Sequence, residues 1–186
     1  MTCIAAIEEN GRVYMGADSA GSNGHTLYFR RDPKMFRVGE FLYGCTSSYR
    51  MTQLLRFKFR PPEHRPDVPL DVYLHTSWVD AVRKCFKAGG YLYKKDEVER
   101  GGFFLVGYRG ILFQVESDFQ IGLTHDRWDA VGCGALVARG ALHAMRDIDW
   151  SPHERLRRAL AAAEHCVEGV RRPFIFRSIG KKEASR

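Results

Sequence analysis

Thr2 is the residue through which this chain could most directly do chemistry. It follows Met1 and begins an apolar run, Cys3 to Ile7, that is rich in β-forming residues. A small residue in second place usually allows the initiator Met to be removed, which would leave Thr2 with a free α-amino group. The hydroxyl could then attack as a nucleophile while the amine of the same residue, with an ordinary pKa of about 7.7–8.0, takes its proton. Because a Thr after Met also begins many ordinary proteins, other residues have to support this interpretation.

Two charged residues follow Thr2 at equal spacing. Asp18 stands 16 residues after Thr2, at the end of a second apolar run that Asn10-Gly11 joins to the first as a predicted hairpin. Lys34 stands a further 16 residues along, at the start of another apolar run. Both residues have plain structural alternatives, since Asp18 could cap a turn and Lys34 could be an exposed lysine.

Two segments of small residues complete the pattern. A predicted strand at 41–46 runs into Ser47 and Ser48, and Gly132-Cys133-Gly134 leads into a predicted helix. The order of Thr, acid, Lys and small-residue turn resembles the proteasome β-subunit family, and especially its bacterial relative HslV, over nearly the whole chain. The residues that match the catalytic positions of this family are Thr2, Asp18, Lys34, Ser47 and Cys133.

The resemblance implies a role for each matched residue. Asp18 would form an ion pair that holds Lys34. Lys34 would sit near Thr2, keep its amine neutral by like-charge repulsion and lower the pKa of its hydroxyl. The backbone N–H of Ser47 would stabilise the oxyanion that forms when the hydroxyl attacks a carbonyl.

Two of the matched positions depart from the family pattern. Ser47 and Ser48 replace the usual Gly-Gly, which narrows the backbone freedom of the turn but leaves its N–H groups in place. Cys133 replaces a Ser that hydrogen-bonds the N-terminal amine, and a thiol is the poorer donor and acceptor. Ser22 and Cys45 are expected near the walls of the substrate pocket.

The resemblance also implies a site for a monovalent cation, such as Na⁺, in the turn after the last helix. The backbone carbonyls of Ala163, Cys166 and Gly169 fall where this site should lie. The alternative is an ordinary helix C-terminus. No cofactor is required by the chemistry proposed for Thr2.

Cys3 is a rival nucleophile by residue type. In the Cys-first amidases of the wider superfamily, however, Cys is the first residue after processing, and nothing visible suggests cleavage between Thr2 and Cys3. Side chains alternate along a strand, so Cys3 would face away from Thr2. We therefore expect Cys3 to be a packing residue.

Composition is that of a single folded cytoplasmic domain over residues 1–186. The chain is 45% hydrophobic and 12% aromatic, and no stretch reaches the ~18 consecutive apolar residues of a membrane span. The five cysteines are odd in number and lack metal-ligand spacing, which favours reduced thiols. The formal charge is +7, but the basic residues are scattered and no nucleic-acid motif accompanies them. We therefore expect neither a nucleic acid nor a membrane as partner.

The order of predicted elements is strands, two helices, strands, two helices, which is typical of an α+β, four-layer αββα sandwich. This is also the N-terminal nucleophile hydrolase fold that the resemblance implies. Strands are predicted at 2–8, 12–18, 26–30, 35–38, 41–46, 103–108, 111–115, 119–123, 128–131 and 174–176. Helices are predicted at 48–57, 70–87, 134–146 and 152–168, the last with Ser151, Pro152 and Glu154 at capping-box spacing.

The function that these residues predict is peptide-bond hydrolysis by Thr2 in a chambered particle. Members of the resembled family enclose the nucleophile in stacked rings of six or seven subunits and depend on an ATP-dependent unfoldase or another gatekeeper. The resemblance therefore implies a ring-forming homo-oligomer. The main alternative is a ring-forming scaffold subunit with weak or no activity, which the changes at Ser47 and Cys133 would suit. A small-molecule amidase of the same superfamily is a third alternative.

Overall fold

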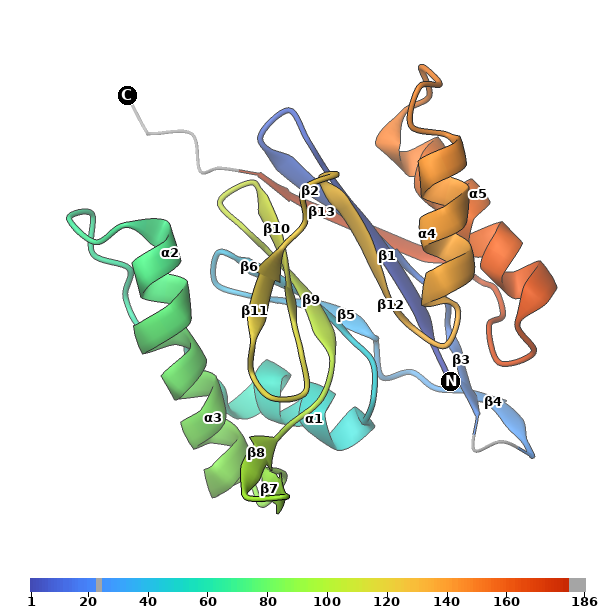
Figure 1. The fold of residues 1–186 in the computed structure, drawn as a ribbon. Helices are drawn as coiled ribbons and strands as arrows, with labels where there is room; N and C mark the ends of the chain where they lie inside the picture. Colours follow the sequence, from blue (N-terminus) through green and yellow to red (C-terminus); the bar gives the residue numbers. More distant parts are fainter. Residues whose placement is uncertain (23–24, 181–186) are drawn as a thin grey trace.

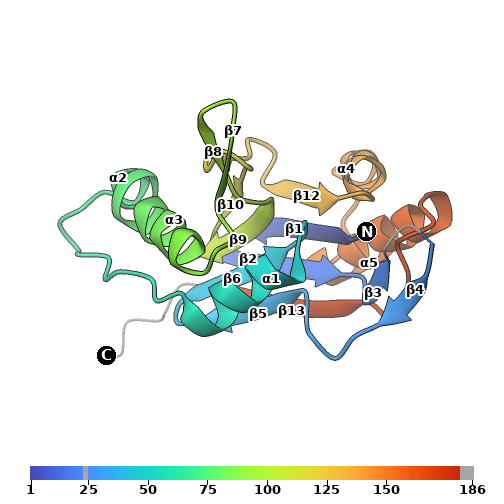
Figure 2. The ribbon, with the colours of Figure 1, turned by 90° about the horizontal axis from the view of Figure 1, so that it is seen from below.

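Two antiparallel sheets lie face to face between two layers of helices (Figures 1 and 2). The computed structural model describes residues 1–22 and 25–180, so the domain predicted over 1–186 extends beyond the described residues at 23–24 and 181–186. The order of layers is helices, sheet, sheet, helices. This confirms the predicted αββα sandwich.

The first sheet contains the N-terminal strand and has the order β12-β1-β2-β13. Its strands are β1 (Cys3–Glu9), β2 (Arg12–Ala17), β12 (Trp128–Gly132) and β13 (Ile175–Gly180). The predicted turn at Asn10-Gly11 joins β1 to β2, and both residues have positive φ, 52° and 68°, as a tight hairpin requires.

The second sheet has the order β11-β10-β9-β6-β5. Its strands are β5 (Met35–Val38), β6 (Phe41–Cys45), β9 (Phe104–Tyr108), β10 (Ile111–Val115) and β11 (Ile121–Leu123). Two short ribbons lie outside both sheets: β3 (Ala20–Ser22) with β4 (Leu27–Phe29), and β7 (Tyr93–Lys95) with β8 (Val98–Arg100).

Helices cover the outer face of each sheet. The second sheet carries α1 (Tyr49–Gln53) with its π-helical continuation Leu54–Lys58, and a rod made of α2 (Leu70–Tyr73), the π-helical turn Leu74–Trp78 and α3 (Val79–Ala88). The first sheet carries α4 (Ala135–Ala144) and α5 (Pro152–Cys166). The predicted cap of α5 is present, since the Ser151 side chain accepts a hydrogen bond from the Glu154 N–H.

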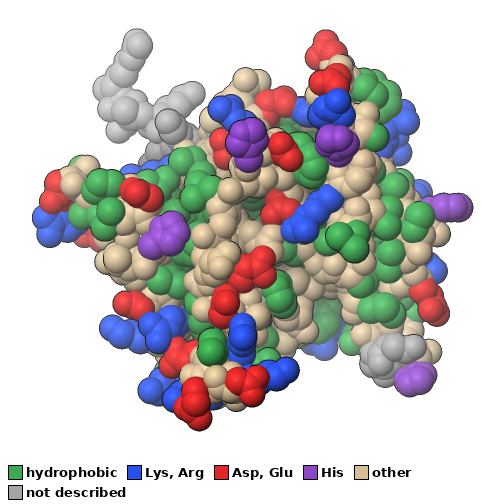
Figure 3. Space-filling model, in the orientation of Figure 1, with side chains coloured by type: hydrophobic (Ala, Val, Ile, Leu, Met, Phe, Trp, Pro, Cys, Tyr) green, Lys and Arg blue, Asp and Glu red, His purple; other side chains and the backbone are tan. Residues whose placement is uncertain are grey.

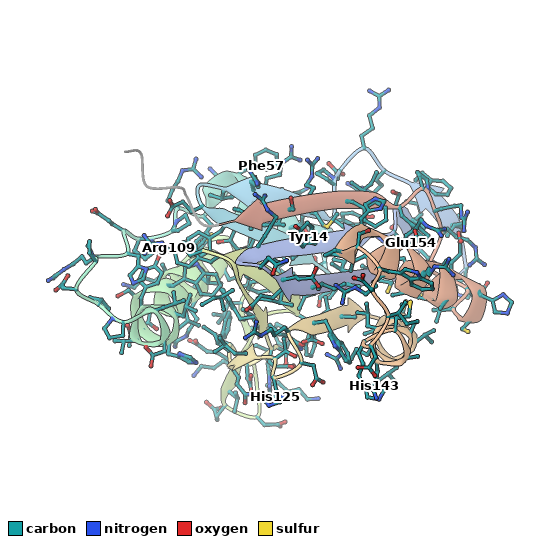
Figure 4. The ribbon with its side chains drawn as sticks, turned by 90° about the horizontal axis from the view of Figure 1, so that it is seen from above. Tyr14, Phe57, Arg109, His125, His143 and Glu154 are labelled. Carbon is teal, nitrogen blue, oxygen red and sulfur yellow. The ribbon has the colours of Figure 1, made fainter. Side chains whose placement is uncertain are left out.

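Three apolar cores match the three interfaces between the four layers. Alternation along β1 divides its residues between two of them: Cys3, Ala5 and Ile7 pack against α4 and α5, whereas Ile4 and Ala6 face the second sheet. The third core, between the second sheet and α1 to α3, is rich in stacked aromatic rings. Figure 4 shows how densely side chains fill the space around the strands. Nothing in the described part of the chain is a helix long and apolar enough to cross a membrane.

Most predicted elements are present, and the differences lie in short strands. The ribbon β7–β8 and the strand β3 were not predicted, because each of these strands has only three residues, too few to show a pattern. The last strand continues to Gly180 instead of ending at 176, since it pairs along the whole of β2.

Candidate active site

A pocket of about 270 Å³ lies around Met1 and Thr2, before the start of β1. Figure 1 shows the N-terminus beside the β3 strand. Its walls come from both sheets, from the β3–β4 ribbon and from the turn before α1. Four of the five predicted catalytic residues line it, namely Thr2, Lys34, Ser47 and Cys133. The fifth, Asp18, lies directly behind Lys34. Ser22 and Cys45, expected near the walls, also line the pocket.

Strand register explains why residues so far apart in sequence meet here. Cys3 pairs with Gly132, so the next residue outward on each strand places Thr2 beside Cys133. On the other side of β1, Ile4 pairs with Ala17, which puts Asp18 across from Cys3. In the second sheet, the Cys45 N–H donates to the Lys34 carbonyl at 2.8 Å, so Lys34 and the following turn share one end of the sheet.

Thr2 is held in place while Met1 is still attached. Its side chain is nearly buried, and its hydroxyl donates to the Met1 carbonyl at 2.6 Å. Its backbone N–H donates to Cys133 Sγ at 3.2 Å. Cys133 Sγ in turn donates to the Thr2 carbonyl at 3.3 Å, and the Gly134 N–H donates to the same carbonyl. The thiol therefore contacts the nitrogen that removal of Met1 would turn into an amine.

Asp18 and Lys34 form a buried ion pair below the pocket. Lys34 Nζ donates to Asp18 Oδ1 and to the Ala20 carbonyl, both at 2.6 Å. The same carboxylate accepts backbone N–H groups from Cys3, Ala20 and Arg171. Burial lowers the pKa of Lys34 below its ordinary value, and the carboxylate beside it opposes part of this shift.

Ser47 lines the pocket at the turn before α1. Ser47 has φ +62°, a left-handed conformation that usually calls for Gly, and its hydroxyl accepts the Phe103 N–H at 3.0 Å. Within the described residues, the backbone N–H of Ser47 has no hydrogen-bond partner. Ser48 caps α1 by accepting the Arg50 N–H. The Gly-Gly of the resembled family is thus replaced by two serines whose side chains both support the turn.

No histidine, aspartate or glutamate of the described chain lines this pocket. His125, in the loop after β11, and His143, on α4, lie on the outer surface away from it (Figure 4). The amines that could act as a general base next to Thr2 are that of Lys34 and the one that Met1 removal would expose on Thr2.

Comparisons with known proteins give the fold. No protein-family model matches the chain, and no curated protein matches it. Among solved structures, BPH from Thiobacillus denitrificans is 20% identical with a TM-score of 0.81, covering 98% of this chain and 100% of that one. A structure of BPH in complex with epoxomicin gives a TM-score of 0.82 at 19% identity over the same shares of both chains. Eukaryotic HslV from Trypanosoma brucei is 13% identical with a TM-score of 0.70, covering 96% of this chain and 99% of that one.

The chain has the HslV-like fold. A structure of an Anbu Gly-1 mutant from Hyphomicrobium sp. strain MC1 agrees, at 14% identity and a TM-score of 0.66, with all of this chain and 86% of that one covered. At these identities the likeness concerns the fold, and the roles of individual residues have to be argued from their geometry.

The turn after α5, where an HslV-like chain was expected to bind a monovalent cation, holds a guanidinium group. Nη1 of Arg171 donates to the carbonyls of Glu164, Val167 and Val170, at 3.2, 3.2 and 2.7 Å. These are the carbonyls one residue after each predicted ligand.

Of the predicted ligands themselves, the Ala163 carbonyl accepts the Val167 N–H, and Gly169 packs against the Met1 side chain. Cys166 is exposed at the end of α5. The residues present therefore fit an ion poorly, because Arg171 already brings a positive charge to this turn.

Sequence reasoning missed Arg171, and it named Gly132 only as part of the segment Gly132-Cys133-Gly134. Arg171 joins the turn to the ion pair, since its N–H reaches Asp18 and its carbonyl accepts the Ser19 N–H. Gly132 has φ +100°, and a Cβ there would come within 2.2 Å of the Thr2 carbonyl oxygen. Nothing in the sequence distinguishes Arg171 from other surface arginines.

Cys3 lies where the alternation of β1 predicts. It is fully buried against α4 and α5, and burial raises the pKa of its thiol to about 12. It does not line the pocket around Thr2.

Proposed function

We propose that this chain is a threonine peptidase subunit of a proteasome-like ring, in which Thr2 hydrolyses peptide bonds after Met1 is removed. The observation that carries the proposal is the pocket that joins Thr2 to Lys34, the unused Ser47 N–H and Cys133. Each group has the chemistry that acyl transfer requires, and the HslV-like fold supports the assignment.

Removal of Met1 would change Thr2 at both of its reactive atoms. The hydroxyl would lose its acceptor, the Met1 carbonyl, and become free to attack. The Thr2 nitrogen would become a primary amine that keeps its place beside Cys133 Sγ. Nucleophile and base would then lie on one residue, in a pocket that no carboxylate or imidazole of the described residues lines.

The reaction follows from this arrangement. The Thr2 hydroxyl gives its proton to the Thr2 amine, through a water molecule, and Oγ bonds to the peptide carbonyl carbon. The Ser47 N–H stabilises the resulting oxyanion. The positive charge of Lys34 lowers the pKa of the Thr2 amine, which keeps this amine neutral and able to accept a proton before the attack. The C–N bond then breaks as the leaving amine takes the proton, which leaves an ester on Thr2. Water, deprotonated by the same amine, hydrolyses this ester and restores the enzyme.

The assembly that we propose is a homo-oligomer of stacked rings in the cytoplasm that works with an ATP-dependent unfoldase on protein or peptide substrates. Large apolar side chains on the outer elements support contacts between subunits: Leu136 on α4 is 80% exposed, Phe29 on β4 60% and Phe57 after α1 57%. Figure 3 shows apolar side chains scattered over the face that carries α4.

Two observations favour the alternative, a scaffold subunit of the same fold. The turn that presents the Ser47 N–H is strained by its positive φ, and Cys133 is a weaker hydrogen-bonding partner for the amine than a hydroxyl would be. The intact ion pair of Lys34 with Asp18 argues for activity, because a scaffold has no use for a charged lysine below the pocket.

The experiment that separates these proposals is intact mass spectrometry of the purified particle before and after incubation with epoxomicin. Its epoxyketone forms a ring adduct only with a hydroxyl and an adjacent free amine, and a structure of BPH holds this compound. We expect loss of Met1 and one adduct on Thr2 in the natural chain, and no adduct in Thr2→Val, which keeps the shape of the side chain. Retention of Met1 would overturn the mechanism, and a trimmed but unlabelled ring would support the scaffold. A small unlabelled oligomer that hydrolyses amides would support the amidase instead.

A further inference from the structure

A second hollow adjoins the pocket around Thr2. It has a volume of about 410 Å³ and shares Thr46 and Ser47 with the first pocket, so the two lie on either side of the turn before α1. Its remaining walls come from the segment before β9, from β10, from β12 and from α4: Phe103, Gln114, Glu116, Ala130, Val131, Gly132, Ala135 and Arg139. A peptide bound at Thr2 would therefore reach this hollow with a neighbouring side chain.

Polar side chains along one wall of the hollow form a hydrogen-bonded chain that ends at Glu116. Arg139 Nε lies 2.6 Å from Asp129 Oδ1, and Arg139 Nη2 donates to Gln114 Oε1 at 3.1 Å. Gln114 Nε2 then donates to Glu116 Oε1. Arg139 is the cation of this hydrogen-bonded series, and it is already paired with Asp129. Glu116 is hydrogen-bonded to the Gln114 amide and not to Arg139 itself.

Glu116 is left without a cation of its own. Within the described residues no Lys, Arg or His lies within salt-bridge distance of its carboxylate, although it is half-buried. Burial raises the pKa of Glu116, the nearby Asp118 raises it further, and Arg139 offsets this only in part. A carboxylate in this state gains from any positive charge that reaches it.

The surroundings of Glu116 are acidic although the whole chain is basic. A neighbouring hollow beyond Arg139 adds Asp126 and Asp129, so that carboxylates outnumber the single guanidinium. Figure 3 shows acidic side chains on this face, in the region of β11 and toward α4. The net charge of the chain is +7, so this local excess of acid is a departure from the average surface.

We propose that this hollow is a substrate subsite that binds a Lys or Arg side chain next to the scissile bond, with Glu116 as the group that recognises its charge. The proposal rests on the proposed peptidase function. Phe103, Val131 and Ala135 provide an apolar wall for the aliphatic stem, while the free Glu116 Oε2 accepts the charged head. An acidic substrate side chain would be repelled by Glu116, and Arg139 would not compensate because it is already paired with Asp129.

The test is to digest a mixture of unstructured peptides with the assembled, Met1-trimmed particle and to map every cleavage site by mass spectrometry. The mapping gives the residues before and after each cleaved bond, so the test does not depend on knowing which substrate position the hollow binds. We expect Lys and Arg to be enriched at one position, with kcat/KM about tenfold higher than for a matched peptide carrying norleucine there. The enrichment should fall as salt rises, because the interaction is between charges near the surface.

Variants assign this preference to Glu116. In Glu116→Gln the advantage in kcat/KM of the Lys and Arg peptides over the norleucine peptide should disappear, and Glu116→Lys should favour an acidic residue at the same position. Asp118→Asn is the matched control, since Asp118 is a nearby acid that pairs with Arg100 and does not line the hollow; it should keep the preference. The salt dependence of the natural enzyme is a second readout that does not depend on any variant folding.

The outcomes separate the subsite from the function on which it rests. Epoxomicin labelling with peptide cleavage but no basic preference, or a preference that survives in Glu116→Gln, overturns the subsite and leaves the peptidase intact. Absence of both labelling and cleavage overturns the proposed function, and the subsite with it.

Discussion

The ammonium of Lys34 lies 2.6 Å from the carboxylate of Asp18, and their side chains are only 6% and 0% exposed. Charges this deeply buried are costly unless every partner is in place. Here the three backbone N–H groups on Asp18 and the Ala20 carbonyl on Lys34 complete the set. The pair therefore fixes the position of a positive charge at the floor of the pocket.

Replacing Asp18 by Asn should remove the partner of Lys34 and leave a buried ammonium. We expect a loss of about 3–5 kcal/mol in the free energy of unfolding, measured by urea denaturation, together with loss of epoxomicin labelling. Asp67→Asn breaks the exposed pair with Arg65 and should cost less than about 1 kcal/mol. Equal losses in the two variants would show that the buried pair has no special role.

Gly132 should be irreplaceable because of the backbone that it brings against Thr2. In Gly132→Ala, the Cβ would lie 2.2 Å from the Thr2 carbonyl oxygen at a φ of +100°. We expect a loss of more than ~2 kcal/mol in the free energy of unfolding. Gly140, inside α4, has no atom within 4 Å of such a Cβ, so Gly140→Ala should stabilise by about 0.5–1 kcal/mol. A tolerated Gly132→Ala would contradict the close approach of β12 to Thr2.

Arg171 should make the turn after α5 independent of monovalent cations. We expect the unfolding free energy of the natural protein to be the same in sodium chloride and choline chloride. Arg171→Met removes the positive charge from the carbonyls of Glu164, Val167 and Val170 and should lose ~2–3 kcal/mol, part of which Na⁺ restores. Arg146→Met, at the exposed end of α4, is the control and should show no ion dependence. A natural protein that Na⁺ stabilises as strongly as the variant would show that the turn does bind an ion.

The parts of the fold that could be predicted are those with a strong local signal. Asn10-Gly11 between apolar runs predicts the β1–β2 hairpin, and Ser151-Pro152 with Glu154 predicts the start of α5. The three-residue strands β3, β7 and β8 could not be predicted, because three residues are too few to show an alternation of apolar and polar side chains.

The site shows the same division. Thr2, Asp18 and Lys34 could be singled out because their order resembles a known family, and strand register then brings them together. Arg171 could not be singled out, because a guanidinium that binds backbone carbonyls requires no residue type at the positions that it contacts. The charge state of Glu116 likewise depends on which side chains the fold places around it.

Cysteine reactivity should separate the buried thiols from the exposed ones. The thiolate is the reactive form, and burial raises the pKa of Cys3 to about 12 and also that of Cys45. Iodoacetamide at pH 8 should therefore label the exposed Cys133 and Cys166 and spare Cys3 and Cys45, as peptide mapping would show. Because the folded state raises the pKa of Cys3 above the ordinary thiol value of 9.0, the protonated thiol contributes its full stabilisation at pH values below 9.0. This contribution is lost as the pH rises toward about 12. Rapid labelling of Cys3 in the folded protein would contradict its packing against α4 and α5.

Ser47→Gly tests whether the oxyanion donor is the backbone or the side chain of this residue. The variant keeps the backbone N–H of this residue and relieves the strain of a side chain at positive φ, but it loses the hydrogen bond from the Phe103 N–H to the hydroxyl. We expect kcat for a peptide substrate to change less than about threefold, because loss of a true oxyanion donor costs ~10²–10³. Ser48→Ala, which removes the cap of α1, should lower the free energy of unfolding by about 1 kcal/mol with little effect on kcat. A drop of a hundredfold or more in Ser47→Gly would assign the oxyanion to the hydroxyl, and the replacement of Gly by Ser at this turn would then be part of the chemistry.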